Sequence, residues 1–353
     1  DSNESPNSFL YTSFIKLSCF VTSSRLPSSG ISPMTFSYIL ILANNCSEYI
    51  EAKLAAAKSG VILAAQNWRL GDRELTHCIS LVAPKLIIAS PQFYKNITRL
   101  ALEDLPSIII GDDYEARLSQ VDSRYPDLTI DPESGLFILY TSGTTGLPKG
   151  ALISHRAIVA RSLMFSVETG VPRDNYFAAW TPLSHMVASD QAMGELIRGG
   201  TVHVVDGFQP DKLIPIIETQ KMHWFTLVPG MVGAFVEECK KRNVKPKGIS
   251  YIGAMADLVP RNELAEATTF FNAPYWNTFG ATETGIAPAS GSYVAIGEAP
   301  LSLPKRQTAF CDLRLVDSEG NDVADGHPGE VSLKGPSLFS FFIIVTDGFF
   351  LLV

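Results

Sequence analysis

The sequence predicts an α/β fold in which parallel or mixed β-sheets are flanked by helices. Between residues 34 and 290, short apolar runs of strand length alternate with amphipathic segments. Such alternation is typical of βαβ units, and strands that helices cover on both faces form near-continuous apolar runs. After Gly291 the helical pattern stops and turn-rich, strand-like segments follow, so we expect residues 291–353 to begin a small β-rich subdomain.

The expected elements follow one another in a regular order. Residues 1–33 are Ser-rich and irregular, and we assign them no role. Asn45 and Glu48 resemble a capping box for a helix that Gly60 ends, whereas the acidic residues 111–134 suggest a surface connection. Further helices are expected at 72–80, from 155 onward, at 187–198, from 210 onward, at 231–241 and at 261–269. Strands are expected at 61–65, 85–89, 107–110, 136–140, 177–180, 201–205, 224–228, 249–252, 275–279, 309–316 and 330–334.

Composition excludes several classes of protein. With 353 residues and 46% hydrophobic content, the chain can bury a large core in more than one lobe. The net charge of −8 and the lack of a Lys/Arg run argue against a nucleic-acid partner. No stretch reaches the roughly 18 uninterrupted apolar residues of a transmembrane helix, so we expect no membrane span.

The cysteines indicate a reducing compartment. They are odd in number, far apart and never spaced as C-x-x-C, which argues against a disulfide framework or a zinc site. We therefore expect an intracellular protein, with the cytoplasm as the simplest location and the peroxisome or another organelle left open. The five cysteines are Cys19, Cys46, Cys78, Cys239 and Cys311.

The most informative stretch runs from Leu139 to Gly150. An apolar run leads into it, and residues 141–150 hold four hydroxyls, three glycines and one lysine. An amphipathic segment begins at His155, so the expected order is strand, loop, helix. Glycines allow backbone N–H groups to face a ligand, and hydroxyls, N–H groups and a lysine suit phosphate oxygens. The loop is thus predicted to cradle phosphate.

Two known phosphate loops do not fit this stretch. The P-loop of nucleoside triphosphatases needs glycine before its lysine and Ser or Thr after it, whereas Pro148 and Gly150 stand there. The Rossmann pattern fails because Thr144 and Thr145 follow Gly143. A Gly/Thr-rich solvent loop without function remains the simple alternative.

The loop resembles the signature loop of the adenylate-forming (AMP-dependent synthetase/ligase) superfamily, [S/T]-S-G-[S/T]-T-G-x-P-K-G. Three more segments follow in the family's order. Residues 181–185 resemble its P-x-x-H segment, residues 251–255 stand where its Gly/Ala-rich strand end lies, and residues 277–283 resemble [Y/F]-G-x-[S/T]-E. Residues 55–60 and 67–70 bring the resemblance closest to acyl-CoA synthetases, which include enzymes of fatty acid metabolism.

The resemblance implies that a carboxylic acid attacks the α-phosphorus of ATP to give an acyl-adenylate, from which coenzyme A then displaces AMP. It places Mg²⁺ on Glu283, adenine on Phe279 and the α-phosphate on Thr282. The catalytic residues that it implies are Lys149, His185, Thr282 and Glu283. The nucleotide-binding residues that it implies are Thr141, Ser142, Gly143, Thr144, Thr145, Gly146, Lys149, Gly253, Ala254, Asn277, Phe279, Gly280, Ala281 and Thr282.

The acid itself is not specified by the sequence. Apolar residues near the expected acyl site, namely Phe225, Val228, Met231 and Val232, favour an acyl or aryl acid over an amino acid. The alternative is that these side chains belong to the core.

The resemblance weakens toward Val353. The family continues with a Gly-Tyr-Trp-like segment where residues 341–345 stand, and its R-T-G-D segment, whose aspartate binds ribose, does not follow residues 346–350. We therefore expect an amino-terminal domain without the family's lid domain and its lysine, with little or no ligase activity. A non-catalytic protein that binds ATP or AMP is the second hypothesis.

Overall fold

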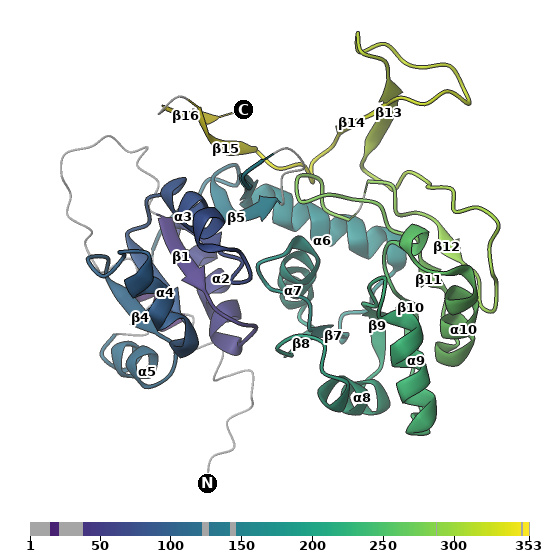
Figure 1. Cartoon of the computed structure of the whole chain (residues 1–353), viewed down its shortest axis with the longest axis horizontal. Helices are drawn as coiled ribbons and strands as arrows, with labels where there is room; N and C mark the ends of the chain where they lie inside the picture. The colour runs from purple at the N-terminus through teal and green to yellow at the C-terminus, as the bar shows by residue number, and fades with distance from the viewer. Residues whose placement is uncertain are drawn as a thin grey trace. The chain divides into compact units, whose positions relative to one another are not determined.

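The computed structural model describes residues 15–20, 38–121, 127–141, 146–286, 288–346 and 349–352. Its chain divides into two compact units (Figure 1). The first comprises Asp1–His155, Pro182–Met186 and Phe339–Val353, and the second comprises Arg156–Thr181 and Val187–Leu338. The limits expected after residues 33 and 290 are not limits of these units, and as domain boundaries they stay predictions. Of the first 33 residues only 15–20 are described, and these are helical.

The first unit is built on an eight-stranded sheet with the order β16-β15-β6-β5-β2-β1-β3-β4. Strands β5, β2, β1, β3 and β4 are parallel, and β6, β15 and β16 join them in antiparallel fashion. The strands are β1 (Tyr38–Leu42), β2 (Ile62–Ala65), β3 (Leu86–Ala89), β4 (Ser107–Ile109), β5 (Gly135–Thr141), β6 (Lys149–Ser154), β15 (Phe341–Thr346) and β16 (Phe349–Leu352). The helices are α2 (Ser47–Ser59), α3 (Asp72–Ser80), α4 (Tyr94–Arg99), α5 (Asp112–Ser119) and the 3₁₀ turn η1 (Pro91–Phe93).

The second unit contains a six-stranded sheet with the order β12-β11-β10-β9-β7-β8, parallel except for β12. A separate antiparallel pair, β13 and β14, projects from it (Figure 1). The strands are β7 (Tyr176–Ala179), β8 (Thr201–Val204), β9 (Met222–Phe225), β10 (Ile249–Ile252), β11 (Tyr275–Trp276), β12 (Tyr293–Val294), β13 (Asp312–Val316) and β14 (Glu330–Lys334). The helices are α6 (His155–Thr169), α7 (Met186–Arg198), α8 (Pro210–Thr219), α9 (Val232–Lys241), α10 (Arg261–Phe271) and the 3₁₀ turn η2 (Ala256–Leu258).

These elements confirm the predicted α/β fold and the small β-rich segment near the end. Strands β1 and β2 are buried along almost their whole length, as expected of apolar runs that are covered on both faces. In the second unit, α8, α9 and α10 pack on the sheet through side chains such as Leu213, Phe235 and Leu264. On α6, Phe165 packs against Trp224 and Trp276, with ring centroids 6.1 and 5.4 Å apart.

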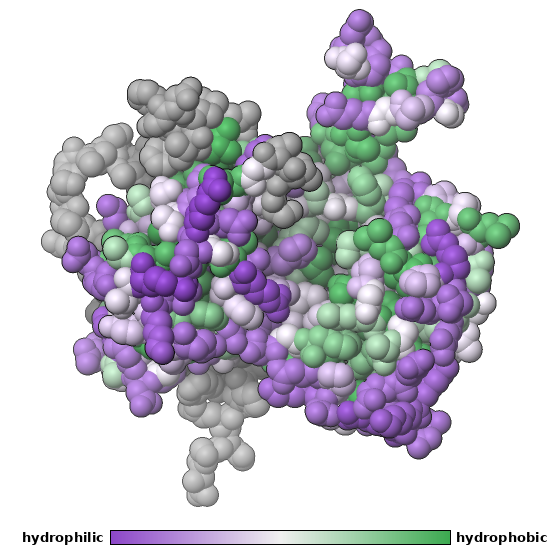
Figure 2. Space-filling view, viewed as in Figure 1, coloured by the Kyte–Doolittle hydropathy of each residue, from purple (hydrophilic) through white to green (hydrophobic). Residues whose placement is uncertain are grey.

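Polar side chains gather around the start of α8 and the end of α9 in the second unit (Figure 2). Arg242 pairs with Asp211 at 2.6 Å and with Glu238 at 2.6 Å, and Lys240 pairs with Glu266 at 2.5 Å. These side chains are between 31% and 82% exposed, so the pairs are accessible to solvent and add little stability. Among the described residues, no helix combines the length and the apolar character that a membrane crossing requires.

Four local expectations were wrong. Strand β6 lies between the 141–150 loop and α6, so the order is strand, hairpin loop, strand and helix. Residues 112–119 form α5, because acidic side chains in its first turn favour the positive helix end and Tyr114 and Leu118 are buried. Asn45 is no helix cap, since its Oδ1 atom accepts a hydrogen bond from the Leu183 N–H at 2.8 Å. Strand β11 ends at Trp276, where the chain turns into the loop that carries residues 277–285.

Candidate functional site

The 141–150 segment forms a β-hairpin in the first unit. Thr141 pairs with Lys149 across the β5–β6 ladder, and the loop between them includes exposed Gly146. Ser142, Gly143, Thr144 and Thr145 lie outside the described residues. The Lys149 ammonium lies 5.2 Å from the centroid of the Phe342 ring on β15 and makes a cation–π contact with it.

Polar contacts connect the base of this hairpin to α3 and to Gln66, which follows β2. The Tyr140 hydroxyl donates to the Cys78 carbonyl at 2.8 Å and accepts from Gln66 Nε2 at 3.0 Å. Burial raises the pKa of Tyr140 well above its usual range, which keeps the phenol a neutral donor. His77 Nε2 lies 3.1 Å from the Pro148 carbonyl. Residues on both sides of the loop are therefore hydrogen-bonded to α3.

His185 also belongs to the first unit, in the short segment Pro182–Met186. Its side chain is exposed, and its backbone N–H donates to the Pro182 carbonyl at 2.9 Å. The segment is anchored by buried Leu183, whose N–H bonds to Asn45. The predicted histidine thus stands on a short turn with a fixed backbone.

At the end of β10 in the second unit, Gly253 and Ala254 pack closely on Tyr275. Gly253 has φ +75°, and a Cβ there would lie 2.0 Å from the Tyr275 ring, so only glycine fits. The Gly253 carbonyl accepts from Trp224 Nε1 at 2.8 Å, and the Ala254 carbonyl accepts from the Tyr275 hydroxyl at 3.0 Å. Both N–H groups are bonded as well. Both residues are buried, and their N–H and C=O groups are all engaged within the protein.

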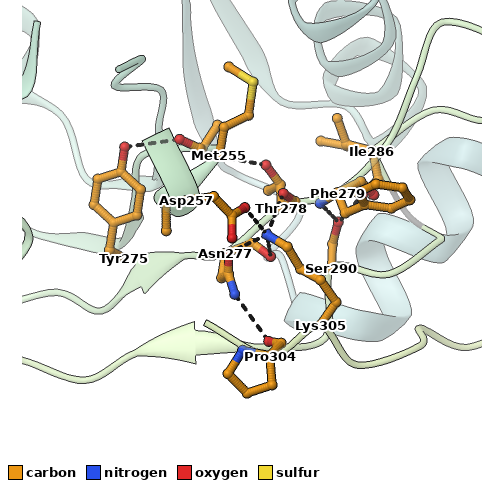
Figure 3. Close-up of polar contacts among 12 residues, drawn as sticks. Met255, Asp257, Tyr275, Asn277, Thr278, Phe279, Ile286, Ser290, Pro304 and Lys305 are labelled. Carbon is orange, nitrogen blue, oxygen red and sulfur yellow. Dashed lines mark hydrogen bonds and ion pairs between the residues drawn. The ribbon is translucent and has the colours of Figure 1, made fainter. Parts of the chain in front are cut away.

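The loop after β11 presents an aromatic ring to solvent. Phe279 is 40% exposed, although its backbone is clamped by Ser290, whose Oγ accepts from the Phe279 N–H at 3.0 Å (Figure 3). Asn277 is buried, with its Nδ2 donating to the Pro304 carbonyl at 3.1 Å. The Thr278 Oγ1 atom accepts from the Met255 N–H at 2.9 Å. A ring on such a fixed backbone is suited to stacking against a planar base.

Thr282 and Glu283 lie in a tight turn. The Gly285 N–H donates to the Ala281 carbonyl at 2.8 Å. A Cβ on Gly280 would lie 2.0 Å from the Gly285 carbonyl oxygen, so this position requires glycine. Both Thr282 and Glu283 are partly exposed, and a hydroxyl and a carboxylate are therefore available side by side.

The turn is held from behind by Arg161, which sequence reasoning missed. Arg161 lies on α6 with its side chain 4% exposed, and its Nη2 donates to the Thr282 carbonyl at 3.0 Å. Its Nη1 pairs with Asp190 at 2.9 Å, and its Nε donates to the Ser337 carbonyl at 2.9 Å. No sequence pattern singles out this arginine, because its partners lie far from it along the chain.

The donors fit a magnesium ion that arrives with a nucleotide. Glu283 supplies one carboxylate, and the described residues contain no group of three or more His, Cys, Asp or Glu side chains arranged to hold a metal. Mg²⁺ commonly takes one or two carboxylates and fills its remaining positions with phosphate oxygens and water. A single carboxylate at Glu283 would therefore fit a magnesium ion that is bound together with a nucleotide.

The predicted residues fall into two groups. Thr141, Gly146, Lys149 and His185 lie in the first unit, and the others that are described lie in the second. There the ends of β10 and β11 bring together Gly253, Ala254, Asn277, Phe279, Gly280, Ala281, Thr282 and Glu283. Their roles as ligands or catalysts stay predictions.

Comparisons with known proteins give the family. The model of the AMP-binding enzyme family matches residues 21–342. A feruloyl-CoA synthase of an Amycolatopsis species is 26% identical over 303 residues, covering 85% of this chain and 60% of the relative. An indoleacetate–CoA ligase of Aromatoleum aromaticum is 27% identical over 350 residues, covering 93% of this chain and 67% of the relative. The chain thus spans about 60% of the length of the first of these relatives.

Solved structures share the fold. The N-terminal domain of FACL13 from Mycobacterium tuberculosis superposes with a TM-score of 0.82 at 20% identity, covering 95% of this chain and 83% of that domain. ATP-bound MatB from Rhodopseudomonas palustris gives a TM-score of 0.74 at 19% identity, covering 95% of this chain and 66% of MatB. With a family model that matches most of its length, this chain belongs to the AMP-binding enzyme family and is acyl-CoA ligase-like.

Proposed function

We propose that this protein binds ATP and takes part in the AMP-forming activation of a carboxylic acid. In that reaction a carboxylate oxygen attacks the α-phosphorus of ATP, an acyl-adenylate forms and pyrophosphate leaves. The thiol of coenzyme A then attacks the acyl carbon, AMP leaves, and an acyl-CoA results. Family membership supports the reaction class. The structural observation that carries the proposal is the exposed Phe279 ring in the loop that also bears Thr282 and Glu283.

Each residue has a role that its chemistry supports. Phe279 stacks on the adenine, and the Thr282 hydroxyl donates to an oxygen of the α-phosphate. Glu283 holds Mg²⁺, which would neutralise phosphate charge when bound. In the first unit, Lys149 and the 141–146 loop take the β- and γ-phosphates, and His185 lines the route of the acid. Because such chemistry depends mostly on positioning and charge stabilisation, no covalent catalyst is required.

We further propose an aryl or acyl acid as substrate. Relatives named as feruloyl-CoA synthase, indoleacetate–CoA ligase and 4-coumarate–CoA ligase support the aryl class. The apolar residues expected to line the acid site give weaker support, since Phe225 and Val232 are fully buried in the core. Val228 and Met231 are only partly buried and stay candidates for contact with the acid.

Nucleotide binding is tested by calorimetric titration of the purified chain with AMP and with ATP plus Mg²⁺. We expect Phe279→Ala to weaken both by roughly tenfold or more, because stacking of a base on an aromatic ring is worth about 1–3 kcal/mol. Lys149→Ala should weaken ATP more than AMP, since its predicted contacts are the β- and γ-phosphates. Phe310→Ala serves as the matched control, because this exposed ring belongs to none of the family's segments. Unchanged affinities in Phe279→Ala would contradict the assignment.

Turnover is measured separately, by exchange of labelled pyrophosphate into ATP in the presence of ferulate, indoleacetate or a fatty acid. Exchange that depends on one of these acids supports the adenylation step and identifies the acid class. Binding of ATP without any exchange would favour the alternative function, an ATP- or AMP-binding protein without ligase activity. Absence of nucleotide binding would overturn both.

A further inference from the structure

Lys305 reaches the ends of β10 and β11 from the segment between β12 and β13. Its ammonium pairs with Asp257 at 2.5 Å, donates to the Thr278 carbonyl at 3.1 Å and contacts the Asn277 carbonyl at 3.5 Å (Figure 3). It also donates to the side-chain Oδ1 of Asn277. One lysine thus donates to or contacts three oxygens of the two residues that directly precede Phe279.

These acceptors are the ones that the edge of an adenine base would use. Adenine presents an exocyclic amino group as hydrogen-bond donor, and a stacked base must place this group near its stacking ring. Asn277 Oδ1 and the Thr278 carbonyl lie next to Phe279 in the chain and accept hydrogen bonds. The neighbouring carbonyls of Gly253 and Ala254 already accept from Trp224 and Tyr275. An amino group and the Lys305 ammonium therefore seek the same oxygens.

We propose that Lys305 is an affinity- and specificity-determining residue of the nucleotide site, because it competes with the base amino group for Asn277 Oδ1 and the Thr278 carbonyl. This inference rests on the proposed function. Adenine displaces the ammonium, which keeps its partner Asp257. That carboxylate is 47% exposed and the lysine side chain 23% exposed, so water can solvate the displaced charge. Displacement is thus feasible. The free energy needed to break the Lys305 contacts lowers the preference of the site for adenine.

The decisive measurement compares AMP with IMP, which carries a carbonyl where adenine carries the amino group. Both nucleotides have the same phosphate charge. The effect of removing the lysine charge on phosphate binding therefore cancels in the ratio of their dissociation constants. In Lys305→Met we expect Kd(IMP)/Kd(AMP) to rise by about threefold to tenfold over the wild-type ratio, the effect of about one hydrogen bond. Lys305→Arg should stay close to wild type, and so should Lys241→Met, which removes an exposed lysine from the end of α9.

A second measurement needs no variant. Wild-type protein is treated with an amine-acetylating reagent, and labelling of each lysine is read by mass spectrometry with and without saturating AMP. Because AMP releases the ammonium, labelling of Lys305 should increase, whereas labelling of Lys241 should not change. Saturating IMP should raise the labelling of Lys305 less than AMP does.

The two proposals fail in different ways. If wild-type protein binds neither AMP nor IMP, the proposed function is wrong. If it binds AMP but the ratio in Lys305→Met stays the same or falls, Lys305 only braces the strand ends and the competition is refuted. If AMP reduces the labelling of Lys305, the competition is likewise refuted. This result can be obtained even if Lys305→Met does not fold.

Discussion

Arg161 makes three hydrogen bonds through one buried guanidinium, and each links α6 to a different segment of the second unit. Its acceptors are Asp190, the Thr282 carbonyl and the Ser337 carbonyl. The planar fork of arginine suits such an arrangement, because its donors point in fixed directions. Arg161 is accordingly a positioning residue for the turn that bears Thr282 and Glu283.

We expect Arg161→Met to lower the free energy of unfolding by about 3–5 kcal/mol, because it leaves the Asp190 carboxylate buried without its cation. Urea denaturation followed by circular dichroism measures the loss. The double variant Arg161→Met/Asp190→Leu should recover part of it, since no unpaired charge then remains. If the double variant lost as much stability as Arg161→Met and Asp190→Leu lose together, the unpaired charge would not be the cause of the destabilisation.

At the scale of elements, α2 and α5 are joined by a buried polar contact. The Tyr114 hydroxyl on α5 donates to the Glu51 carboxyl on α2 at 2.6 Å, and both side chains are buried. Burial is the main cause that raises the pKa of Glu51 from 4.5 to about 7. In the folded protein this carboxyl therefore keeps its proton at pH values where the unfolded chain has lost it.

This difference predicts a pH dependence of stability. Between about pH 4.5 and 7 the folded state binds more protons at Glu51 than the unfolded state does, so stability falls as pH rises through this window. The effect is at most about 3 kcal/mol. Glu51→Gln should flatten the profile, as measured by urea denaturation between pH 5 and 7.5, whereas Glu103→Gln at an exposed position should not. Equal slopes for wild type and Glu51→Gln would contradict the shift.

The elements themselves were largely predictable, and the exceptions have physical reasons. Short apolar runs identified strands such as β2 and β3 to within a residue, because burial on both faces leaves a local pattern. Strand β6 was missed because its residues 149–154 follow a loop and pair with β5 and β15, and the β15 pairing joins residues far apart in the sequence. The contacts of Arg161 and Lys305 were missed for the same reason, since single side chains that act across long separations leave no periodicity.

In the candidate site, the sequence predicted the glycine-containing segments better than the side chains that hold these segments in place. The close fit of Gly253 on Tyr275 and of Gly280 on Gly285 explains why motif positions carry glycine. The engaged carbonyls of Gly253 and Ala254, by contrast, depend on hydrogen bonds from Trp224 and Tyr275 that no motif records.

At the scale of the whole molecule, neither unit is one continuous stretch of chain. Residues 339–353 return to the first unit, where β15 pairs with β6. Ile343 is 3% exposed and packs in a cluster with Ile138 and Leu152. The last strands thus complete the sheet that carries the 141–150 hairpin.

We expect Ile343→Ala to destabilise the protein by about 2–5 kcal/mol, because it removes buried methyl groups from this cluster. Amide hydrogen exchange should accelerate in β6 and in the β5–β6 hairpin, while exchange in β9 and β10 of the second unit should change less. Ile344→Ala, at a partly buried position of the same strand, is the matched control. If amide hydrogen exchange accelerated equally in both units, Ile343 would not stabilise the β5–β6 hairpin locally.

The same return of the chain has a consequence during synthesis on the ribosome. Strand β6 is complete once residue 154 has emerged, but its partner at 341–346 is made after the whole of the second unit. Until then the outer edge of β6 carries unpaired N–H and C=O groups, which favour wrong pairing with other strands. A nascent chain that stalls before residue 341 should therefore be aggregation-prone, and chaperones that shield strand edges should bind it.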